Sequence, residues 1–306
     1  MGKPKIVVVG SSNADMVVKS ERIPAPGETV VGGTFAMVPG GKGANQAVAA
    51  ARAGGDVVFI ARVGNDVFGA SAVEGYEREG IDVSWIRRDE KLATGVALIL
   101  VDAQGENLIS VASGANFALS PADVDAAADV IRSARGVVVQ LETPMETVLR
   151  VAEIAAEAGV PLLLDPAPAP SEPLPAELLK NVAVIKPNES EATRLTGIEV
   201  VDDATARAAA EKLLELGVST AIVTLGASGS FVATKDGVRE KVPALRVEAV
   251  DATAAGDSYS GALAVALAEG RALTDAVAFA SKAASLSVQK FGAQPSLPTR
   301  EEIENA

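Results

Sequence analysis

The chain of 306 residues contains neither cysteine nor histidine. Without cysteine it has no disulfide bonds, thiol nucleophiles or cysteine-ligated zinc sites. Without histidine, every Ser-His-Asp and Cys-His mechanism is excluded, and so are histidine-ligated metal sites. Any chemistry must therefore rely on carboxylates, lysine, backbone amides and cations that prefer oxygen ligands.

Aromatic side chains and net positive charge are also scarce: aromatics make up 3% of the residues and the formal net charge is −13. Such a chain is a poor candidate for binding a phosphate backbone, so we expect no nucleic-acid partner. No apolar run approaches the ~18 residues of a membrane helix, and no signal peptide precedes the strand-like run Ile6 to Val9. We therefore expect no membrane partner and a cytoplasmic location.

Hydrophobic residues make up 48% of the chain, which predicts a packed core. Short apolar runs alternate with helical stretches of 10–15 residues, a pattern typical of a mostly parallel sheet with helices on both faces. We expect one α/β domain over residues 1–306. Two segments, about 15–38 and 94–112, alternate apolar and polar residues. The first predicts a small antiparallel patch that serves as a lid or a partner surface, and the second predicts a hairpin that adds to the lid.

Polar residues follow several of the predicted strands, at the sheet edge where α/β proteins bind ligands. They are Asn13, Asp15, Glu142, Asp165, Asn188, Glu191, Thr224, Asp251 and Asp257. One site along one edge explains this arrangement, although independent polar turns would also produce it.

A glycine-rich segment, Gly40 to Asn45, precedes a helix predicted over Gln46–Arg52. It lacks the spacing of a phosphate-binding P-loop, with no Ser or Thr after Lys42. It also lacks the third glycine of a dinucleotide fingerprint. The glycines permit close approach of the backbone to a ligand, and they also suit an ordinary turn.

A second segment of small residues, Asp251 to Gly261, follows an alternating run at Val242–Val250 and precedes an alanine-rich stretch. This order predicts a strand, a turn and a helix whose N-terminus favours an anion. Asp257 stands where the helix begins. It either caps the helix or takes a proton from a substrate hydroxyl, while the amides of Ala254, Ala255 and Gly256 hold a phosphoryl group.

Together these segments resemble the ribokinase family of carbohydrate kinases. The resemblance rests on Gly40–Ala47, Asp251–Leu263, Lys186–Glu191 and Val223–Gly226, and it extends from Gly10 to Pro298. It implies a three-layer α/β/α fold with a small β lid and a homodimer formed through the lids. Within the family the chain is most similar to the branch that transfers phosphate from ATP to the 5-hydroxyl of D-ribose.

The resemblance also implies a role for each matching residue. Asp257 is the expected base, with an anion hole at Ala254, Ala255 and Gly256. The expected sugar ligands are Asn13, Asp15, Gly41, Lys42, Asn45 and Glu142. Asn188, Thr224, Gly226, Gly229 and Gly256 are expected to bind the nucleotide, and Glu191 to hold Mg²⁺ through water. A monovalent cation site for K⁺ is expected at Asp251, Thr253, Ser287, Lys290, Gly292 and Ser296.

Two rival interpretations stay open. The first is the same chemistry on another acceptor: a ketose, 2-keto-3-deoxygluconate or a nucleoside. The polar set described above favours a small sugar with many hydroxyls, since a nucleoside site would need apolar or aromatic walls. The second rival is a non-catalytic sugar sensor, which would have no need of a base at Asp257.

Overall fold

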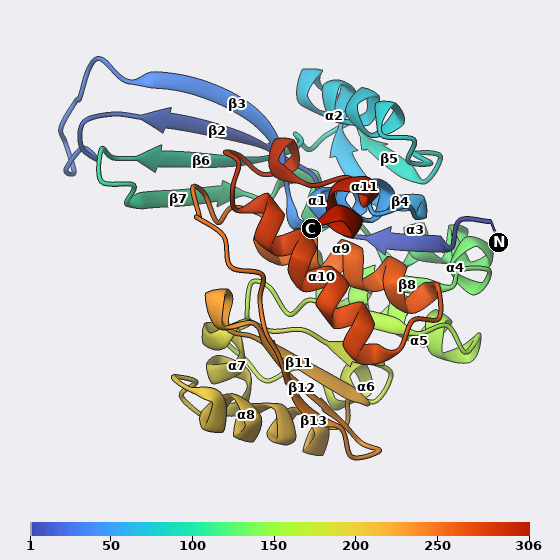
Figure 1. Ribbon diagram of the computed structural model, residues 1–306. Coiled ribbons are helices and arrows are strands. Elements are labelled where there is room, and N and C mark those ends of the chain that lie inside the picture. Colours follow the sequence, from blue (N-terminus) through green and yellow to red (C-terminus); the bar gives the residue numbers. More distant parts are fainter. Residues whose placement is uncertain (1) are drawn as a thin grey trace.

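The predicted α/β alternation is confirmed by a computed structural model that describes residues 2–306 (Figure 1). A nine-stranded sheet runs in the order β13-β12-β11-β10-β9-β8-β1-β4-β5, and only β12 and β13 are antiparallel to their neighbours. Its strands are β1 (Lys5–Val9), β4 (Asp56–Gly64), β5 (Ile86–Asp89), β8 (Gly136–Val139), β9 (Leu162–Leu164), β10 (Val184–Ile185), β11 (Thr220–Thr224), β12 (Ser230–Thr234) and β13 (Arg239–Val242).

Helices connect the strands and cover both faces of this sheet (Figure 1). They are α1 (Lys42–Arg52), α2 (Val67–Arg78), α3 (Pro121–Ala126), α4 (Ala128–Arg132), α5 (Met145–Glu157), α6 (Ala176–Leu179), α7 (Glu189–Thr196), α8 (Asp203–Glu215), α9 (Ala255–Ala268), α10 (Leu273–Ser287) and α11 (Arg300–Asn305), with short 3₁₀ turns η1 (Gly114–Ala118), η2 (Gly226–Ser228) and η3 (Gln294–Ser296). The predicted three-layer architecture is thereby confirmed.

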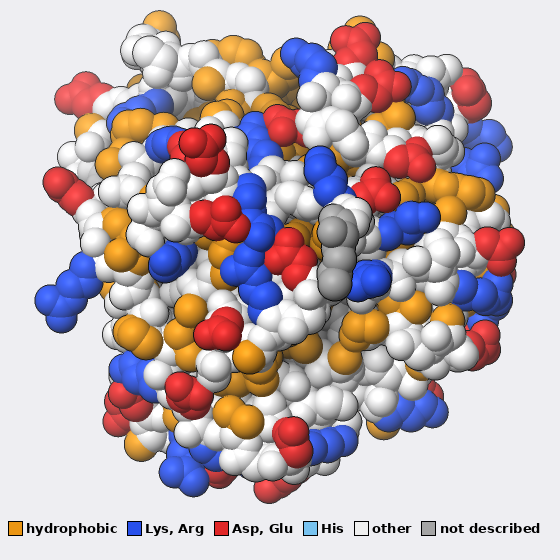
Figure 2. Space-filling model, turned by 45° about the vertical axis from the view of Figure 1, so that its right-hand side comes forward, with side chains coloured by type: hydrophobic (Ala, Val, Ile, Leu, Met, Phe, Trp, Pro, Cys, Tyr) orange, Lys and Arg blue, Asp and Glu red, His pale blue; other side chains and the backbone are white. Residues whose placement is uncertain are grey.

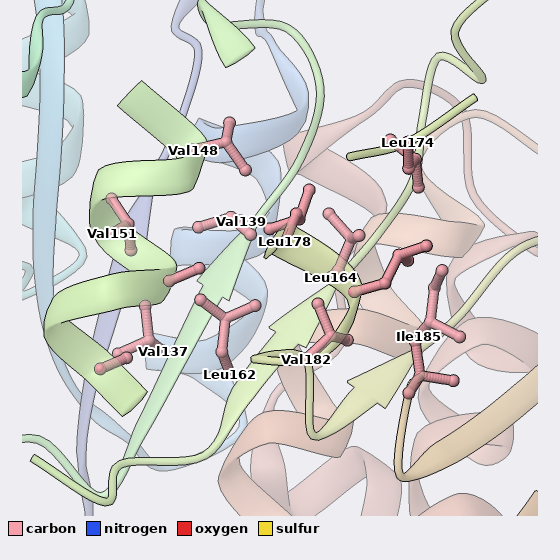
Figure 3. Packing of buried hydrophobic residues seen from close by; sticks show 14 of the residues in the cluster. Val137, Val139, Val148, Val151, Leu162, Leu164, Leu174, Leu178, Val182 and Ile185 are labelled. Carbon is pink, nitrogen blue, oxygen red and sulfur yellow. The ribbon is translucent and has the colours of Figure 1, made fainter. Parts of the chain in front are cut away.

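Alternate residues of each central strand pack on opposite faces. On β8, Val137 and Val139 belong to one core cluster with Val148 and Val151 of α5 (Figure 3), whereas Val138 belongs to the other cluster. That second cluster contains side chains of α1, α9 and α10. Both faces of the strand are buried, which explains why its sequence is an unbroken apolar run.

The lid forms a separate four-stranded sheet in the order β3-β2-β6-β7, which projects from the body in Figure 1. Its strands are β2 (Asn13–Lys19), β3 (Thr34–Gly40), β6 (Gly95–Val101) and β7 (Asn107–Ala112). The predicted antiparallel pairing within the first lid segment is confirmed by β2 and β3, and the predicted hairpin is confirmed by β6 and β7. The two pairs join into one sheet because β2 and β6 pair in parallel, which the sequence did not predict.

Three predicted element boundaries are wrong. The strand before the second small-residue segment ends at Val242 because Pro243 has no N–H to donate, and residues 243–250 form no strand. The helix expected over 121–133 is divided into α3 and α4. Helix α1 begins at Lys42, four residues earlier than expected, so Lys42 and Asn45 lie in its first turn.

The surface carries both signs of charge. On the face shown in Figure 2, Lys and Arg side chains lie among Asp and Glu side chains. Among residues 2–306 no helix combines the length and the apolar character needed to cross a membrane.

Helices α1 and α9 approach each other closely at Gly261. A Cβ atom added to Gly261 would lie 2.6 Å from both the Cβ of Ala49 and the backbone nitrogen of Ala50. Since these neighbours are fixed in α1, they cannot rotate away. The contact therefore requires glycine, and it holds together the two helices that carry the polar residues described below.

We predict that Gly261→Ala destabilises the protein by about 1–3 kcal/mol, the usual cost of overpacking, and lowers the thermal midpoint by roughly 2–12 °C. Calorimetry or circular dichroism measures the shift. Gly75→Ala in α2 is the control, because the closest atom to its added Cβ is a nitrogen of Arg78 at 3.9 Å. A Gly261→Ala protein that melts like the wild type would contradict this packing argument.

Candidate active site

The Asp257 carboxylate lies at the centre of a buried polar cluster. It is in the first turn of α9 and its side chain is 6% exposed. Oδ2 accepts a hydrogen bond from Nδ2 of Asn45, and Oδ1 accepts one from Nε2 of Gln46, each at 2.9 Å. The N-cap position is Ala254, at φ 60°, and no side chain caps this helix. Asp257 therefore does not cap α9, and the interpretation of this residue as a helix cap is excluded.

Backbone amides surround the same turn. The N–H of Ala255 donates to the carbonyl of Ala252 at 3.2 Å, so this member of the predicted anion hole is already bonded. Within residues 2–306, no acceptor bonds the amides of Ala254, Gly256 or Asp257. Because the start of a helix also carries partial positive charge, these three donors can hold an anion.

Burial changes the protonation of the central groups. Desolvation, which Lys42 opposes and the neighbouring Asp165 reinforces, raises the pKa of Asp257 to about 6. Burial lowers the pKa of Lys42, but the carboxylates of Asp257, Asp165, Glu142 and Glu191 outweigh that effect and leave its pKa above the ordinary value. At neutral pH the site therefore contains a charged ammonium next to a carboxylate that can still accept a proton.

Asn13 and Asp15 enter the site from β2, at the base of the lid. Nδ2 of Asn116 donates to Oδ1 of Asn13 at 2.7 Å, which leaves the amino group of Asn13 free to donate elsewhere. Burial, with the negative charges of Glu142 and Asp257, raises the pKa of Asp15 to about 6. Asn116 carries no sequence signal that would have identified it.

Glu142 follows β8 and reaches the start of α1. Its Oε2 accepts hydrogen bonds from the hydroxyl of Ser11 and from the backbone N–H of Lys42 at 3.0 Å. Gly41 precedes that amide with φ 88°, and a Cβ there would lie 2.8 Å from the backbone nitrogen of Asn13. The structure thus brings the predicted residues Asn13, Asp15, Gly41, Lys42, Asn45, Glu142 and Asp257 to one place.

Four buried side chains lie behind Asp257: Gln46, Gln140, Asp165 and Lys186. Asp165 was expected at this sheet edge but was given no role, and the other three were not among the predicted site residues. Gln46 lies inside the glycine-rich motif, and the other three directly follow apolar strands. A polar residue immediately after each buried strand was the signal that pointed to this edge. It did not indicate which side chains turn inward.

The predicted nucleotide residues lie along the next strands of the same edge. Asn188 and Thr224 form an isolated parallel bridge. The Asn188 side chain caps α7 by accepting from the N–H of Glu191 at 2.8 Å, and Glu191 accepts from the N–H of Asn188 at 2.9 Å. Gly226 and Gly229 occupy the turn after β11 with φ of 50° and 96°. The side-chain oxygen of Asn188 is thus used in capping α7, whereas Glu191 keeps one carboxylate oxygen available for a ligand.

The predicted cation-site segments also meet. Oδ1 of Asp251 accepts from the amide of Thr253 at 2.9 Å, and Oδ2 accepts from the amide of Gly292 at 2.8 Å. The hydroxyls of Ser287 and Ser296 are bonded within their own turns, to the carbonyls of Ala284 and Ala293. The Lys290 ammonium pairs with Glu302 on α11, so only backbone atoms of Lys290 are available.

We predict that Lys42→Met raises the pKa of Asp257 above its value of about 6, because it removes the cation that favours the ionised carboxylate. Carboxyl-carbon NMR of aspartate-labelled protein measures this titration. Lys290→Met is the control, since its ammonium pairs with Glu302. An unchanged Asp257 titration in Lys42→Met would contradict the charge arrangement described above.

Known proteins match this chain over nearly its whole length. The chain is 42% identical to the ribokinase of Staphylococcus aureus over 301 residues, which is 98% of each protein. It is 45% identical to a bifunctional ribokinase/ribose-5-phosphate isomerase A from Fructilactobacillus sanfranciscensis, covering 98% of this chain and 56% of that longer protein.

A structure of Arabidopsis thaliana ribokinase complexed with ribose and ATP superposes with a TM-score of 0.93 at 35% identity, covering 100% of this chain and 98% of the other. Residues 3–300 match the family described as pfkB family carbohydrate kinase. Since the family model, the relatives and the fold agree, the chain belongs to the pfkB family of carbohydrate kinases.

Proposed function

We propose that the protein transfers the γ-phosphoryl group of ATP to the 5-hydroxyl of D-ribose and releases ribose 5-phosphate. The observation that carries this proposal is the buried Asp257 carboxylate beside unpaired amides at the start of α9. Membership of the family and similarity to named ribokinases over nearly the whole chain support the same activity.

Asp257 acts as the base in this proposal. It takes the proton of the 5-hydroxyl as the hydroxyl oxygen forms a bond to the γ-phosphorus and the bond to the bridging oxygen of ADP breaks. The amides of Ala254 and Gly256 donate to the oxygens of the transferred group, where negative charge must be held. The raised pKa of Asp257 brings its proton affinity closer to neutrality than that of an exposed carboxylate.

The sugar occupies the space between the base of the lid and the start of α1. Asp15 and Glu142 accept from hydroxyls, whereas Asn13, Lys42 and Asn45 donate to them. Such a set recognises several hydroxyls at once, and an analogue lacking one leaves a buried polar group unpaired. This supports a small sugar over a nucleoside, since aromatic residues make up 3% of the chain.

ATP lies along Asn188, Thr224, Gly226 and Gly229 in this proposal, with its γ-phosphate at Gly256. One residue is suited to Mg²⁺. Burial disfavours the charged form of Glu191 and raises its pKa, and a nearby cation would stabilise the charged carboxylate. Among residues 2–306 no three acidic side chains form a metal cluster, so Glu191 would hold the ion through water. Mg²⁺ supplies charge neutralisation of the triphosphate when bound.

K⁺ is proposed at the junction of Asp251 and Thr253 with Gly292, together with Ser287, Lys290 and Ser296. The side chain of Asp251 is occupied by two backbone amides, so backbone carbonyls are the remaining donors. Such oxygens suit a weakly hydrated monovalent cation. A cytoplasmic location for the enzyme stays a prediction.

The test of the proposal measures ADP release from Mg²⁺-ATP with ribose, 2-deoxyribose, fructose, 2-keto-3-deoxygluconate and adenosine, with and without K⁺. We expect the highest kcat/KM with ribose, stimulation by K⁺, and a fall in turnover as the pH drops below about 6, where Asp257 becomes protonated. Preference for another sugar would overturn the acceptor assignment and keep the phosphoryl transfer.

Asp257→Ala is the matched variant in the same assay. It should lower kcat by about 100- to 10,000-fold, the usual contribution of a general base, while calorimetry still detects ribose binding. Equal loss of binding and turnover would contradict the role of Asp257 as the base. Absence of turnover with every acceptor in folded wild-type protein would favour a sugar sensor.

We also propose that the lid forms a homodimer interface. The register pairs Met16 with Met37 and Leu98, so these side chains share one face of the lid, and Val18 with Phe35 continues it. Phe35 is 65% exposed, Met37 50% and Leu98 54%. Contiguous exposed apolar residues on a small sheet favour cover by a second copy.

We expect Phe35→Asp combined with Met37→Glu to convert a dimer into a monomer, because each charge would have to be buried. Sedimentation velocity measures the change. Val201→Glu is the control, an equally exposed apolar position that precedes α8. A wild-type monomer at all concentrations would overturn this proposal without affecting the proposed activity.

A further inference from the structure

A buried ion pair lies behind Asp257. Nζ of Lys186 is 3.1 Å from Oδ2 of Asp165, and both side chains are 3% exposed. Lys186 also donates to the carbonyl of Gly256 at 3.3 Å, in the first turn of α9. A cation at the start of a helix opposes the helix dipole, and a fully buried pair often contributes little net stability. The pair is therefore poorly explained as a device for folding alone.

Gln46 connects this pair to Asp257. Its Nε2 donates both to Oδ2 of Asp165 and to Oδ1 of Asp257, at 2.9 Å each. Because both partners are carboxylates, only the amino end of Gln46 can face them. Its carbonyl then accepts from Nε2 of Gln140 at 2.6 Å, and the carbonyl of Gln140 is left with no donor among the described residues.

We propose that Asp165 and Lys186 are positioning residues for Asp257: the ion pair fixes Gln46, and Gln46 fixes the orientation of the catalytic carboxylate. The inference rests on the proposed function only in naming Asp257 as the base. The contacts run without interruption from Lys186 to Asp257, and the hydroxyl of Ser260 gives Asp165 a further hydrogen bond at 3.0 Å.

The pair also acts on Asp257 by charge. Charged groups from several elements surround this turn: Lys42 of α1, Asp15 of β2, Glu142 after β8, Asp165 after β9, Lys186 after β10 and Glu191 of α7. Lys42 and Asp165 act directly on the pKa of Asp257, and Asp257 acts on the pKa of Asp15. Glu142 and Glu191 act on the pKa of Lys42. Removing only Asp165 leaves the neighbouring Lys186 uncompensated, and removing only Lys186 leaves a buried carboxylate uncompensated. Removing both charges leaves the net charge near Asp257 unchanged.

The experiment compares Asp165→Asn, Lys186→Met and the double variant D165N/K186M. The readouts are the Asp257 titration by carboxyl-carbon NMR, the pH profile of ribose-dependent ADP release, and thermal stability. We expect Asp165→Asn to lower the pKa of Asp257 by about one unit and to move the acidic limb of the pH profile with it. Lys186→Met should lower kcat about 10- to 100-fold with a smaller change in the KM for ribose.

The double variant should recover most of the activity, because the amide carbonyl introduced by D165N still accepts from Gln46. We expect its kcat within about tenfold of the wild type and its Asp257 titration within about half a unit. The double variant can be tested even if one of the single variants fails to fold. Asp89→Asn is the control: it breaks the ion pair between Arg62 and Asp89 on β4 and β5. It should lower stability without moving the Asp257 titration.

Two outcomes would overturn the inference. One is an unchanged Asp257 titration in the folded single variants, which would make the pair merely structural. The other is a folded double variant at least as impaired as the worse single variant. The NMR titration does not require turnover, so a protein inactive toward ribose still tests the pair while the proposed function fails separately.

Discussion

The structure around the site depends on the burial of one carboxylate. Asp257 lies in the first turn of α9, away from water, and a buried charge is tolerated only where other groups stabilise it. Asn45 and Gln46 of α1 supply hydrogen bonds, and Lys42 supplies the opposite charge. Helices α1 and α9 must therefore be in place together, although they come from opposite ends of the chain.

The close approach of these helices requires small residues where they cross. Gly261 and Ala49 meet where any larger side chain would push the helices apart. Small residues at such crossings let the polar groups of α1 reach Asp257. The same requirement accounts for Gly43, where a Cβ would lie 2.5 Å from the backbone nitrogen of Ser11. Glycine at positions 43 and 261 is thus required by the packing around the site.

The lid is a separate small sheet, and the two roles we propose for it use its opposite faces. Its central strand β2 begins with Asn13 and Asp15, which point into the sugar site we propose, and continues with Met16 and Val18 toward the exposed apolar face. Alternation along a strand places these two sets on opposite sides. Substrate recognition and assembly would therefore be mechanically linked through β2.

The sequence by itself determined the alternating α/β architecture, the lid hairpin and the order of the motifs, because apolar periodicity and turn residues are local properties. It also indicated the sheet edge, since polar residues follow buried strands. It could not exclude Asp257 as a helix cap, place Ala254 in the left-handed conformation, or predict the parallel pairing of β2 with β6. The link from Lys186 through Asp165 and Gln46 to Asp257 was also decided by tertiary structure. Those features depend on groups far apart in the chain, and only packing determines which of them meet and which way each side chain turns.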